Sequence, residues 1–310
     1  FYDPIDPDPA RRYKSFNPGQ LAVSPDGKIW TTLKGVSIPS QDEFNFSFDQ
    51  TERLYIATVK HSGPYGRSVH LSTSRDFEQW TKPELIFHAD DLDQQLGRRN
   101  IKARLDDPTR QKIFYNDPTV YNVEVYNMAV FRYEGLYIGI PAMYHAVGKV
   151  PNYPNTVGFQ MLQLTCSRDL KNWKRLGDRK AFIPYSPRDS GAYDLTQMAP
   201  PSFALRRGPN FPADAGGLDQ DELWFYYTAV KYRGGWEYVG TFPNGKHIPF
   251  PHLDRDSSAI NLAVLRRDGF VSLDGDEQAG DLLTKTLVVE GDQLLLNLDA
   301  HKGGSARVEV

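Results

Sequence analysis

One short pattern occurs three times in this chain of 310 residues: Ser, any residue, Asp, three further residues and Trp. Its copies read "SPDGKIW" from Ser24, "SRDFEQW" from Ser74 and "SRDLKNW" from Ser167. Each copy lies between two short strand-like runs, so each predicts a β-hairpin whose polar turn holds the Ser and the Asp. In such a turn both side chains accept backbone N–H groups, and the Trp lies on the outgoing strand and is buried against a neighbouring sheet. We therefore interpret the repeated Asp as a structural brace and not as a catalyst.

A fourth, degenerate copy lies in "LAVLRRDGFVSL", where Arg266 replaces the Ser and Ser272 replaces the Trp. Successive copies begin 50, 93 and 99 residues apart. Because blades of four strands repeat about every 40–50 residues, the spacing predicts one propeller blade per copy, with insertions in the longer intervals. The candidate insertions are residues 90–111, 148–156 and 206–220. The predicted fold class is an all-β radial array of at least four blades, with one short surface helix in "DDLDQQLGRR".

The composition fits a globular β protein and narrows the range of partners. The chain is 40% hydrophobic and 13% aromatic, with 17 Tyr, 17 Phe and 5 Trp, which is typical of strands and of sugar-binding clefts. A formal charge of −3 gives no general attraction to nucleic acid or to anionic lipid. No run of 18 apolar residues is present, so no membrane span is expected. We expect a carbohydrate partner, and neither nucleic acid nor a membrane.

The two ends of the sequence predict that the chain is a slice of a longer protein. It begins at Phe1 without Met, no signal-like segment opens it, and its last residues, "SARVEV", alternate as a strand does. After Asp276 the motif disappears, and three short strand-like runs follow with "EGD" and "KGG" turns. We therefore expect a propeller domain over residues 1–276 and the start of a C-terminal β-sandwich or jelly-roll module over residues 277–310.

The order of several motifs resembles that of five-bladed β-propeller glycosidases. The motifs are "DPDPARRYKSF", "SPDGKIW", "STSRDFEQW", "VYNMAVFRYEGLYIG" and "LRRDGFVSLD". The chain is most similar to uncharacterised bacterial proteins related to the invertase and arabinanase families, glycoside hydrolase families 32 and 43. This resemblance covers residues 6–310 and implies five blades, a following sandwich module, a sugar bound in an axial funnel, and an extracellular or periplasmic location. It also implies that the first blade, which carries one catalytic Asp in those families, lies upstream of Phe1 or is supplied by another chain or segment.

Glycoside hydrolysis uses two carboxyl groups, one of which its surroundings keep protonated. In a propeller the innermost strand of each blade starts at the central funnel, so the informative acids are those at the starts of strands. Three places qualify in this sequence. They hold Asp42 and Glu43 in "QDEFNFSF", Glu124 in "YNVEVYNMAV", and Asp194 in "GAYDLTQMAPPS". For each acid alone, capping of a loop backbone or exposure to solvent is the alternative interpretation.

The sequence predicts a role for each of these acids. Glu124 is the predicted general acid, because its apolar neighbours Val123 and Val125 would desolvate it and favour its protonated form. Asp42 is predicted to fix the sugar ring or to stabilise developing oxocarbenium charge, and Asp194 to bind hydroxyls. His145 is an alternative acid, with a structural role as its other interpretation. The predicted substrate-binding residues are Glu43, Tyr126, Asn127, His145, Tyr193 and Gln197.

Other chemistries are weakly represented in the sequence. It contains no CxxC or HExxH pattern, no Gly-rich phosphate loop and no GxSxG elbow. No cofactor is expected, although the many acids would allow a structural Ca²⁺, for which no loop has the EF-hand spacing. The leading function is a glycoside hydrolase acting on a small glycoside or an oligosaccharide end. The alternatives are a sialidase-like hydrolase, because the turn motif resembles the sialidase Asp-box, and a non-catalytic carbohydrate-binding propeller.

Overall fold

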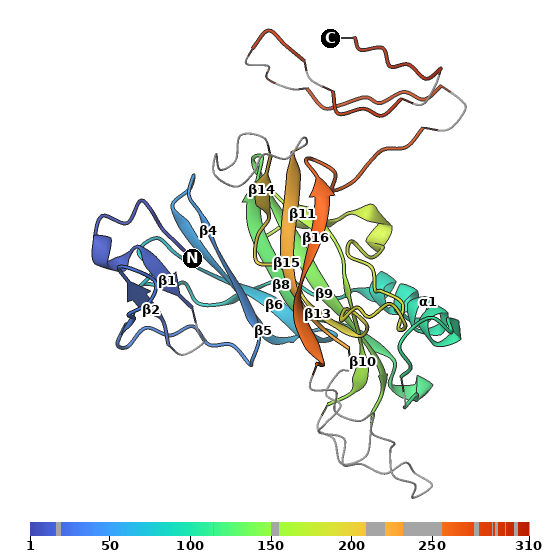
Figure 1. Cartoon of the computed structure of the whole chain (residues 1–310), viewed down its shortest axis with the longest axis horizontal. Helices are drawn as coiled ribbons and strands as arrows, with labels where there is room; N and C mark the ends of the chain where they lie inside the picture. The colour runs from blue at the N-terminus through green and yellow to red at the C-terminus, as the bar shows by residue number, and fades with distance from the viewer. Residues whose placement is uncertain are drawn as a thin grey trace, which may run out of the picture.

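The computed structural model describes residues 1–16, 20–113, 115–149, 155–208, 221–231, 256–275, 279–286, 288, 291–294, 296–300 and 303–309. Over these residues the fold is all-β with few helices, and its four antiparallel sheets follow one another in chain order as a propeller-like ring (Figure 1). The predicted all-β radial array of at least four blades is thus confirmed. A fifth blade and the C-terminal sandwich stay predictions.

The first two sheets come from the N-terminal part of the chain. The first sheet orders β1 (Tyr13–Ser15), β2 (Ala22–Ser24) and β3 (Thr31–Thr32), and η1 (Pro9–Arg11) precedes it. On the other edge of β1, Phe1 and Lys14 exchange backbone hydrogen bonds of 2.8 and 2.9 Å. The second sheet orders β4 (Phe44–Asp49), β5 (Leu54–Gly63), β6 (Gly66–Ser74) and β7 (Glu84–Phe87).

In the third and fourth sheets, one edge of a long strand pairs with two short strands instead of one long strand. In the third sheet, β9 pairs with β8 along one edge and with the short strands β10 and β11 along the other. The last strand, β12, pairs with β11. These strands are β8 (Asn122–Tyr133), β9 (Leu136–Gly148), β10 (Val157–Leu162), β11 (Thr165–Ser167) and β12 (Trp173–Arg175). In the fourth sheet, two short strands share the edge of β15 that lies opposite β16. These strands are β13 (Gln197–Ala199), β14 (Leu205–Arg207), β15 (Glu222–Val230) and β16 (Ser258–Arg266).

The repeated motif forms the predicted braced turn in the first three sheets. In its first copy, Asp26 accepts the N–H groups of Lys28 and Ile29 at 2.8 and 2.9 Å. The second and third copies repeat these bonds at Asp76 and Asp169, with distances of 2.7 to 2.9 Å. The turns join β2 to β3, β6 to β7 and β11 to β12. The interpretation of the repeated Asp as a brace is therefore confirmed.

Two details of the motif differ from the sequence-based expectation. Trp80 and Trp173 are half-buried against the core, but Trp30, which directly precedes the two-residue strand β3, is 41% exposed. The degenerate fourth copy keeps a turn, in which Gly269 donates its N–H to the carbonyl of Arg266 at 3.1 Å. The described residues 269–275 form no strand after it, so the predicted fourth hairpin is not present there.

Neighbouring sheets pack on each other through apolar side chains. Between the first and second sheets, Val23 lies with Tyr55 and Phe77. Between the second and third sheets, Val69 lies with Val125. A larger cluster joins the third and fourth sheets and includes Ile138, Ile140, Leu162, Met198, Leu223 and Phe225. Because each sheet buries its faces against the next one, the starts of strands from different sheets come near each other.

The predicted short helix is present as α1 (Asp91–Asp106), between the second and third sheets in the sequence. Its N-cap Asp90 and Asp93 form a capping box, which satisfies N–H groups that the first turn leaves without partners. Hydrogen bonds from Arg179, the largest influence, lower the pKa of Asp90 to about 2. The two remaining short helices are η2 (Pro118–Val120) and η3 (Gly177–Arg179). No helix of the described residues is long and apolar enough to cross a membrane.

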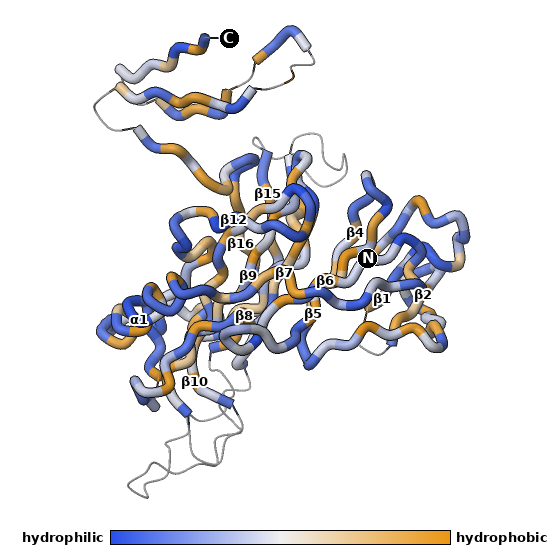
Figure 2. The backbone as a smooth tube through the Cα atoms, turned by 180° about the vertical axis from the view of Figure 1, so that it is seen from behind, coloured by the Kyte–Doolittle hydropathy of each residue, from blue (hydrophilic) through white to orange (hydrophobic). Residues whose placement is uncertain are grey.

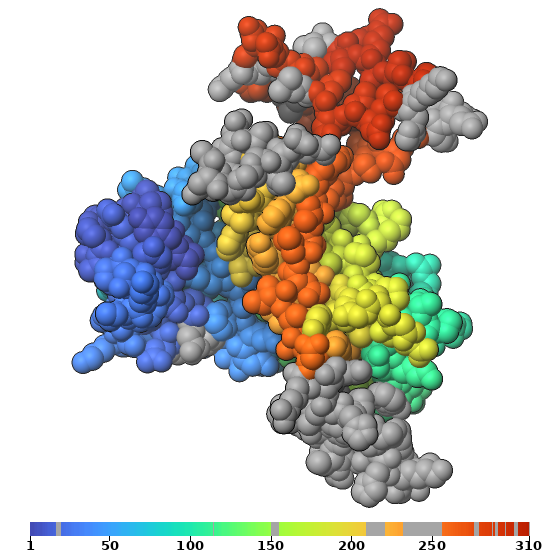
Figure 3. All heavy atoms as spheres, in the orientation of Figure 1, coloured from blue at the N-terminus to red at the C-terminus, as the bar shows by residue number. Residues whose placement is uncertain are grey.

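Two parts of the molecule have exposed apolar surface. Tyr226, Ile260 and Val264 on β15 and β16 are each about half exposed or more, and β16 lies open at the surface in Figure 3. The described residues between 279 and 309 are all exposed and contain no strand, and Arg266 of β16 donates a hydrogen bond of 2.8 Å to Asn297 of this segment. Hydrophobic and hydrophilic residues alternate along that segment (Figure 2). The predicted insertions at 148–156 and 206–220 lie partly outside the described residues.

Candidate functional site

The predicted site acids lie at corresponding places in three sheets. Asp42 and Glu43 directly precede β4, Glu124 is the third residue of β8, and Asp194 lies three positions before β13. Each of these strands is the first of its sheet in chain order, and β4 packs against β8. The acids of the second and third sheets therefore lie near each other, whereas Asp194 lies among residues of the fourth sheet.

Glu124 is bound by a cation from the second sheet. One oxygen of its carboxylate accepts the backbone N–H of Arg67 at 2.8 Å, and the other forms an ion pair with the Arg67 guanidinium. Both side chains are largely buried, with 12% of the Glu124 and 20% of the Arg67 side chain exposed. Glu124 therefore accepts from both the backbone and the side chain of Arg67.

The local sequence explains how Glu124 comes so close to the backbone of β6. Gly66 begins β6 with a φ of +107°, and a Cβ at this position would lie 2.3 Å from a carboxylate oxygen of Glu124. Only glycine has both the conformation and the space that this approach requires. On β8, side chains alternate, so Val123 and Val125 point into the core between the second and third sheets. The two valines thus do not cover the carboxylate as the sequence analysis expected.

Lys60 on β5 forms a second ion pair, with Asp42. The Lys60 side chain is 2% exposed, and its ammonium lies 3.6 Å from the centre of the Tyr126 ring. Burial lowers the pKa of Lys60, opposed by the charges of Asp42 and Glu43. Burial, the largest single influence, would raise the pKa of Asp42, but the ion pair with Lys60, the backbone N–H of Glu43 and the charge of Arg67 together outweigh it and lower that pKa. We call Asp42, Lys60, Arg67, Glu124 and Tyr126 the paired cluster.

A β-bulge places Tyr126 and its neighbours on the same side as Glu124. The pairing of β8 with β9 shifts between Val125 and Asn127, so Tyr126 lies at the bulge. The Arg67 guanidinium lies 5.1 Å from the centre of the Tyr126 ring, so two cations contact this ring. Around the bulge, residues 124–127 of β8 therefore supply a carboxylate, an aromatic ring and a side-chain amide.

A chain of amide hydrogen bonds extends from the paired cluster to the fourth sheet. Asn127 donates to the carboxylate of Glu43 at 3.4 Å, and Asn45 donates to the side-chain oxygen of Asn127 at 2.9 Å. Ser202, between β13 and β14, donates to the side-chain oxygen of Asn45 at 2.9 Å. Three sheets are thus connected by polar side chains at this place.

Asp194 has a different environment from the other acids. It is 5% exposed and accepts a hydrogen bond of 2.9 Å from the hydroxyl of Tyr227. Burial raises the pKa of Tyr227 to about 12, so this hydroxyl is a neutral donor. The second carboxylate oxygen of Asp194 is buried and has no partner among the described residues. Nearby, Tyr193 donates to Asp256 at 2.6 Å, and Gln197 begins β13.

His145 lies inside the third sheet, away from solvent. It is 1% exposed and stacks on Phe159 with ring centres 4.7 Å apart. Its Nδ1 is 3.1 Å from the carbonyl of Met143, and its Nε2 is 3.3 Å from the side-chain amide of Asn100. Burial lowers the pKa of His145 to about 4. These contacts suit the structural interpretation of this histidine.

The residues that hold the acids, above all Lys60 and Arg67, are not among those predicted from the sequence. Both lie in runs that read as ordinary strands, "YIATVKHSG" and "GRSVHLS". One signal was present: a lysine directly follows five residues of β5 that the structure buries, where a charge is costly unless it is paired. Nothing in the sequence indicates that its partner is Asp42 or that Arg67 pairs with Glu124.

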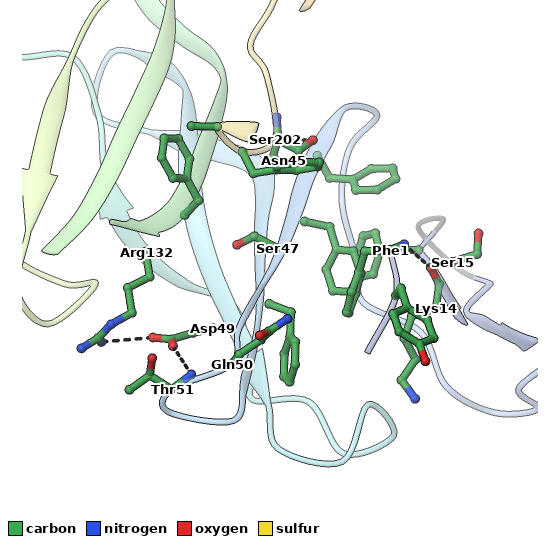
Figure 4. A pocket seen from close by; sticks show the side chains of 18 of the residues that line it. Phe1, Lys14, Ser15, Asn45, Ser47, Asp49, Gln50, Thr51, Arg132 and Ser202 are labelled. Carbon is green, nitrogen blue, oxygen red and sulfur yellow. Dashed lines mark hydrogen bonds and ion pairs between the residues drawn. The ribbon is translucent and has the colours of Figure 1, made fainter. Parts of the chain in front are cut away.

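A separate cavity of about 1100 Å³ lies along β4, beyond the paired cluster (Figure 4). Its lining includes Asn45, Ser47 and Asp49 of β4, together with Arg132 and Ser202. Asp49 is bound on its far side by Arg132 at 3.2 Å. None of the predicted site acids lines this cavity. Among the described residues, no group of three His, Cys, Asp or Glu side chains could hold a metal ion.

No family model matches the chain, and no curated protein matches it in sequence. Among solved structures, it is similar to an N-acetylgalactosamine deacetylase from F. plautii, with 13% identity, a TM-score of 0.46, and coverage of 81% of this chain and 65% of the other. It is also similar to a glycosyl hydrolase from Bacteroides ovatus, with 13% identity, a TM-score of 0.38, and coverage of 81% and 58%.

A third similar structure is the β-1,2-mannobiose phosphorylase of Listeria innocua, with 14% identity, a TM-score of 0.39, and coverage of 82% of this chain and 51% of the other. The chain thus spans between half and two thirds of the length of these proteins. The relation to the invertase and arabinanase families stays an expectation. The function proposed below rests on the residues of the site.

Proposed function

We propose that this chain is the propeller part of a glycoside hydrolase that acts on a small glycoside or an oligosaccharide end, with its centre at the paired cluster. The supporting observation is that Asp42, before β4, and Glu124, on β8, are paired with the two cations that contact the ring of Tyr126, Lys60 and Arg67. Carboxylates and amides bind sugar hydroxyls, and an aromatic face packs on the apolar face of a sugar ring. The order of motifs in the sequence supports the same class.

In this proposal all three acids have roles that differ from the sequence-based expectation. Glu124, paired with Arg67, is the charged carboxylate that stabilises an oxocarbenium-like transition state or directs the attacking group. Asp194, buried beside a neutral hydroxyl and without a cation among the described residues, is the proton donor. Asp42 holds Lys60 and binds hydroxyls at the exposed side of the cluster.

The test is hydrolysis of a panel of aryl glycosides with good and poor leaving groups. Glu124→Gln should lower kcat by about a hundredfold or more with every leaving group, because the charge is needed throughout. Asp194→Asn should lower kcat strongly only with poor leaving groups, because a good leaving group departs without a proton. Asp169→Asn, in a braced turn, is the matched control and should keep its activity per folded molecule. Equal losses in Asp169→Asn and Glu124→Gln would contradict the proposed site.

A second candidate is a non-catalytic carbohydrate-binding propeller. It is favoured by one observation: both acids of the paired cluster already have a cation partner in the absence of a sugar. Such an arrangement binds a ligand without any proton transfer. If the wild-type protein binds sugars by calorimetry but hydrolyses no member of the panel, this second function replaces the first.

A further inference from the structure

The two cations of the paired cluster are each matched by a carboxylate. Arg67 is paired with Glu124, and Lys60 is paired with Asp42. An acidic sugar is recognised through a cation that has no partner inside the protein, because a carboxylate of the ligand then supplies the missing charge. The paired cluster offers a carboxylate ligand no such cation, and Glu124 and Asp42 would repel it.

The Arg67 guanidinium is held in place by more than its ion pair. It donates to the side chain of Asn155 at 3.0 Å and lies 5.1 and 5.5 Å from the ring centres of Tyr126 and Tyr144. Removal of the charge on Glu124 would therefore leave a positioned guanidinium between two aromatic rings. This is the geometry that binds a carboxylate in a bidentate manner.

On the basis of the proposed function, we propose that Glu124 is the specificity-determining residue that makes the site select uncharged sugars and reject sugars with a carboxylate. Its negative charge occupies Arg67 and adds a repulsive element against acidic ligands, the usual means by which a site excludes a close competitor. The inference separates this chain from a sialidase-like hydrolase, whose ligand is an acidic sugar. It does not depend on which neutral sugar is bound.

The experiment compares matched pairs of ligands by titration calorimetry. Each pair has the same ring with a neutral C6 or with a C6 carboxylate: methyl glucoside with methyl glucuronide, and methyl galactoside with methyl galacturonide. The wild-type protein should bind the neutral member of a pair about tenfold more tightly or better. Glu124→Gln should reverse or remove this preference by raising the affinity for the carboxylate member about tenfold.

Three further variants make the result specific to this pair of residues. Glu84→Gln makes the same substitution in an exposed ion pair, Glu84 with Lys171 at 3.2 Å, and should leave the preference unchanged. The double variant Glu124→Gln with Arg67→Gln should lose the gain in carboxylate affinity. Asp42→Asn frees Lys60 at the exposed side of the cluster and should shift the preference in the same direction, which provides a test if Glu124→Gln does not fold.

The outcomes separate this inference from the proposed function. If the wild-type protein binds a carboxylate sugar as tightly as its neutral partner, the inference is overturned while the proposed function stands. If the wild-type protein binds no sugar, the proposed function fails and the inference fails with it. If the wild-type protein prefers the neutral sugar and Glu124→Gln keeps that preference, the inference alone is overturned.

Discussion

Asp76 in the second braced turn and Glu124 in β8 both accept backbone N–H groups, but their partners lie at very different distances along the chain. Asp76 accepts from Glu78 and Gln79, two and three residues further on. Glu124 accepts from Arg67, which lies 57 residues earlier. The turn therefore forms from a seven-residue pattern alone, whereas the environment of Glu124 exists only when the second and third sheets are packed together.

This difference separates a carboxylate that supports the fold from one that is available for chemistry. In each braced turn one oxygen of the Asp carboxylate accepts N–H groups of its own loop, and the same bonds recur in three sheets. In the paired cluster the acids are held by side chains from other strands and contact an aromatic ring. Substitutions in the two regions should consequently change different properties, by different amounts.

The largest expected effect on stability comes from Glu124→Ala. It leaves the largely buried Arg67 without its ion-pair partner, which should lower the free energy of unfolding by about 3 kcal/mol. Asp76→Ala, which removes a cap on exposed backbone, should cost about 1 kcal/mol. Urea denaturation of both variants measures the contrast. Equal losses of unfolding free energy would show that the ion pair of Arg67 with Glu124 contributes no more to stability than a local turn does.

The second prediction compares two copies of the same turn. Trp173→Ala removes a ring that packs with Leu170 on the core, and Trp30→Ala removes one that is 41% exposed. We expect a loss of about 2–3 kcal/mol for Trp173→Ala and less than about 1 kcal/mol for Trp30→Ala, since the cost follows the packing that is lost. Thermal unfolding by circular dichroism measures both. A larger loss at Trp30 would contradict the packing described here.

The third prediction concerns the serine of the turn. Ser74 is 3% exposed, and its hydroxyl accepts the N–H groups of Asp76 and Phe77 at 3.3 and 2.9 Å. Ser74→Ala leaves these groups without an acceptor and should cost about 1–2 kcal/mol. Sugar binding per folded molecule should not change, because the turn lies outside the paired cluster. A changed affinity with unchanged stability would contradict the assignment of the turn as a brace.

The smallest expected effect is a pH dependence at Asp76. Burial alone would raise the pKa of Asp76, but the N–H groups of Gln79 and Glu78 outweigh it and lower that pKa below 3.8. A lowered folded-state pKa means that these bonds stabilise the protein above about pH 4 and lose this effect as the pH falls through the folded-state value. The stability difference between wild type and Asp76→Asn should therefore shrink from pH 7 to pH 3. A constant difference in urea denaturation would show that the charge of Asp76 contributes nothing.

The same contrast explains what the sequence could predict. The braced turns, the helix α1 and the positions of Asp42, Glu124 and Asp194 at strand starts all follow from local spacing, and the structure has each of them there. The partners do not follow, because Lys60 and Arg67 reach the acids through strand pairing and sheet packing. The expected desolvation of Glu124 by Val123 and Val125 was wrong for the same reason. The sequence shows which residues adjoin Glu124 along its strand, but not which face of that strand the neighbouring sheet covers.

The most direct test of the central claim is a crystal structure of the protein soaked with a neutral monosaccharide that it binds in solution. We expect a sugar ring at the paired cluster, against Tyr126 and within hydrogen-bond distance of Glu124 or Asp42, and no sugar at the braced turns. A sugar bound only in the cavity beside Ser47 and Asp49, with the paired cluster unoccupied, would contradict the proposed site.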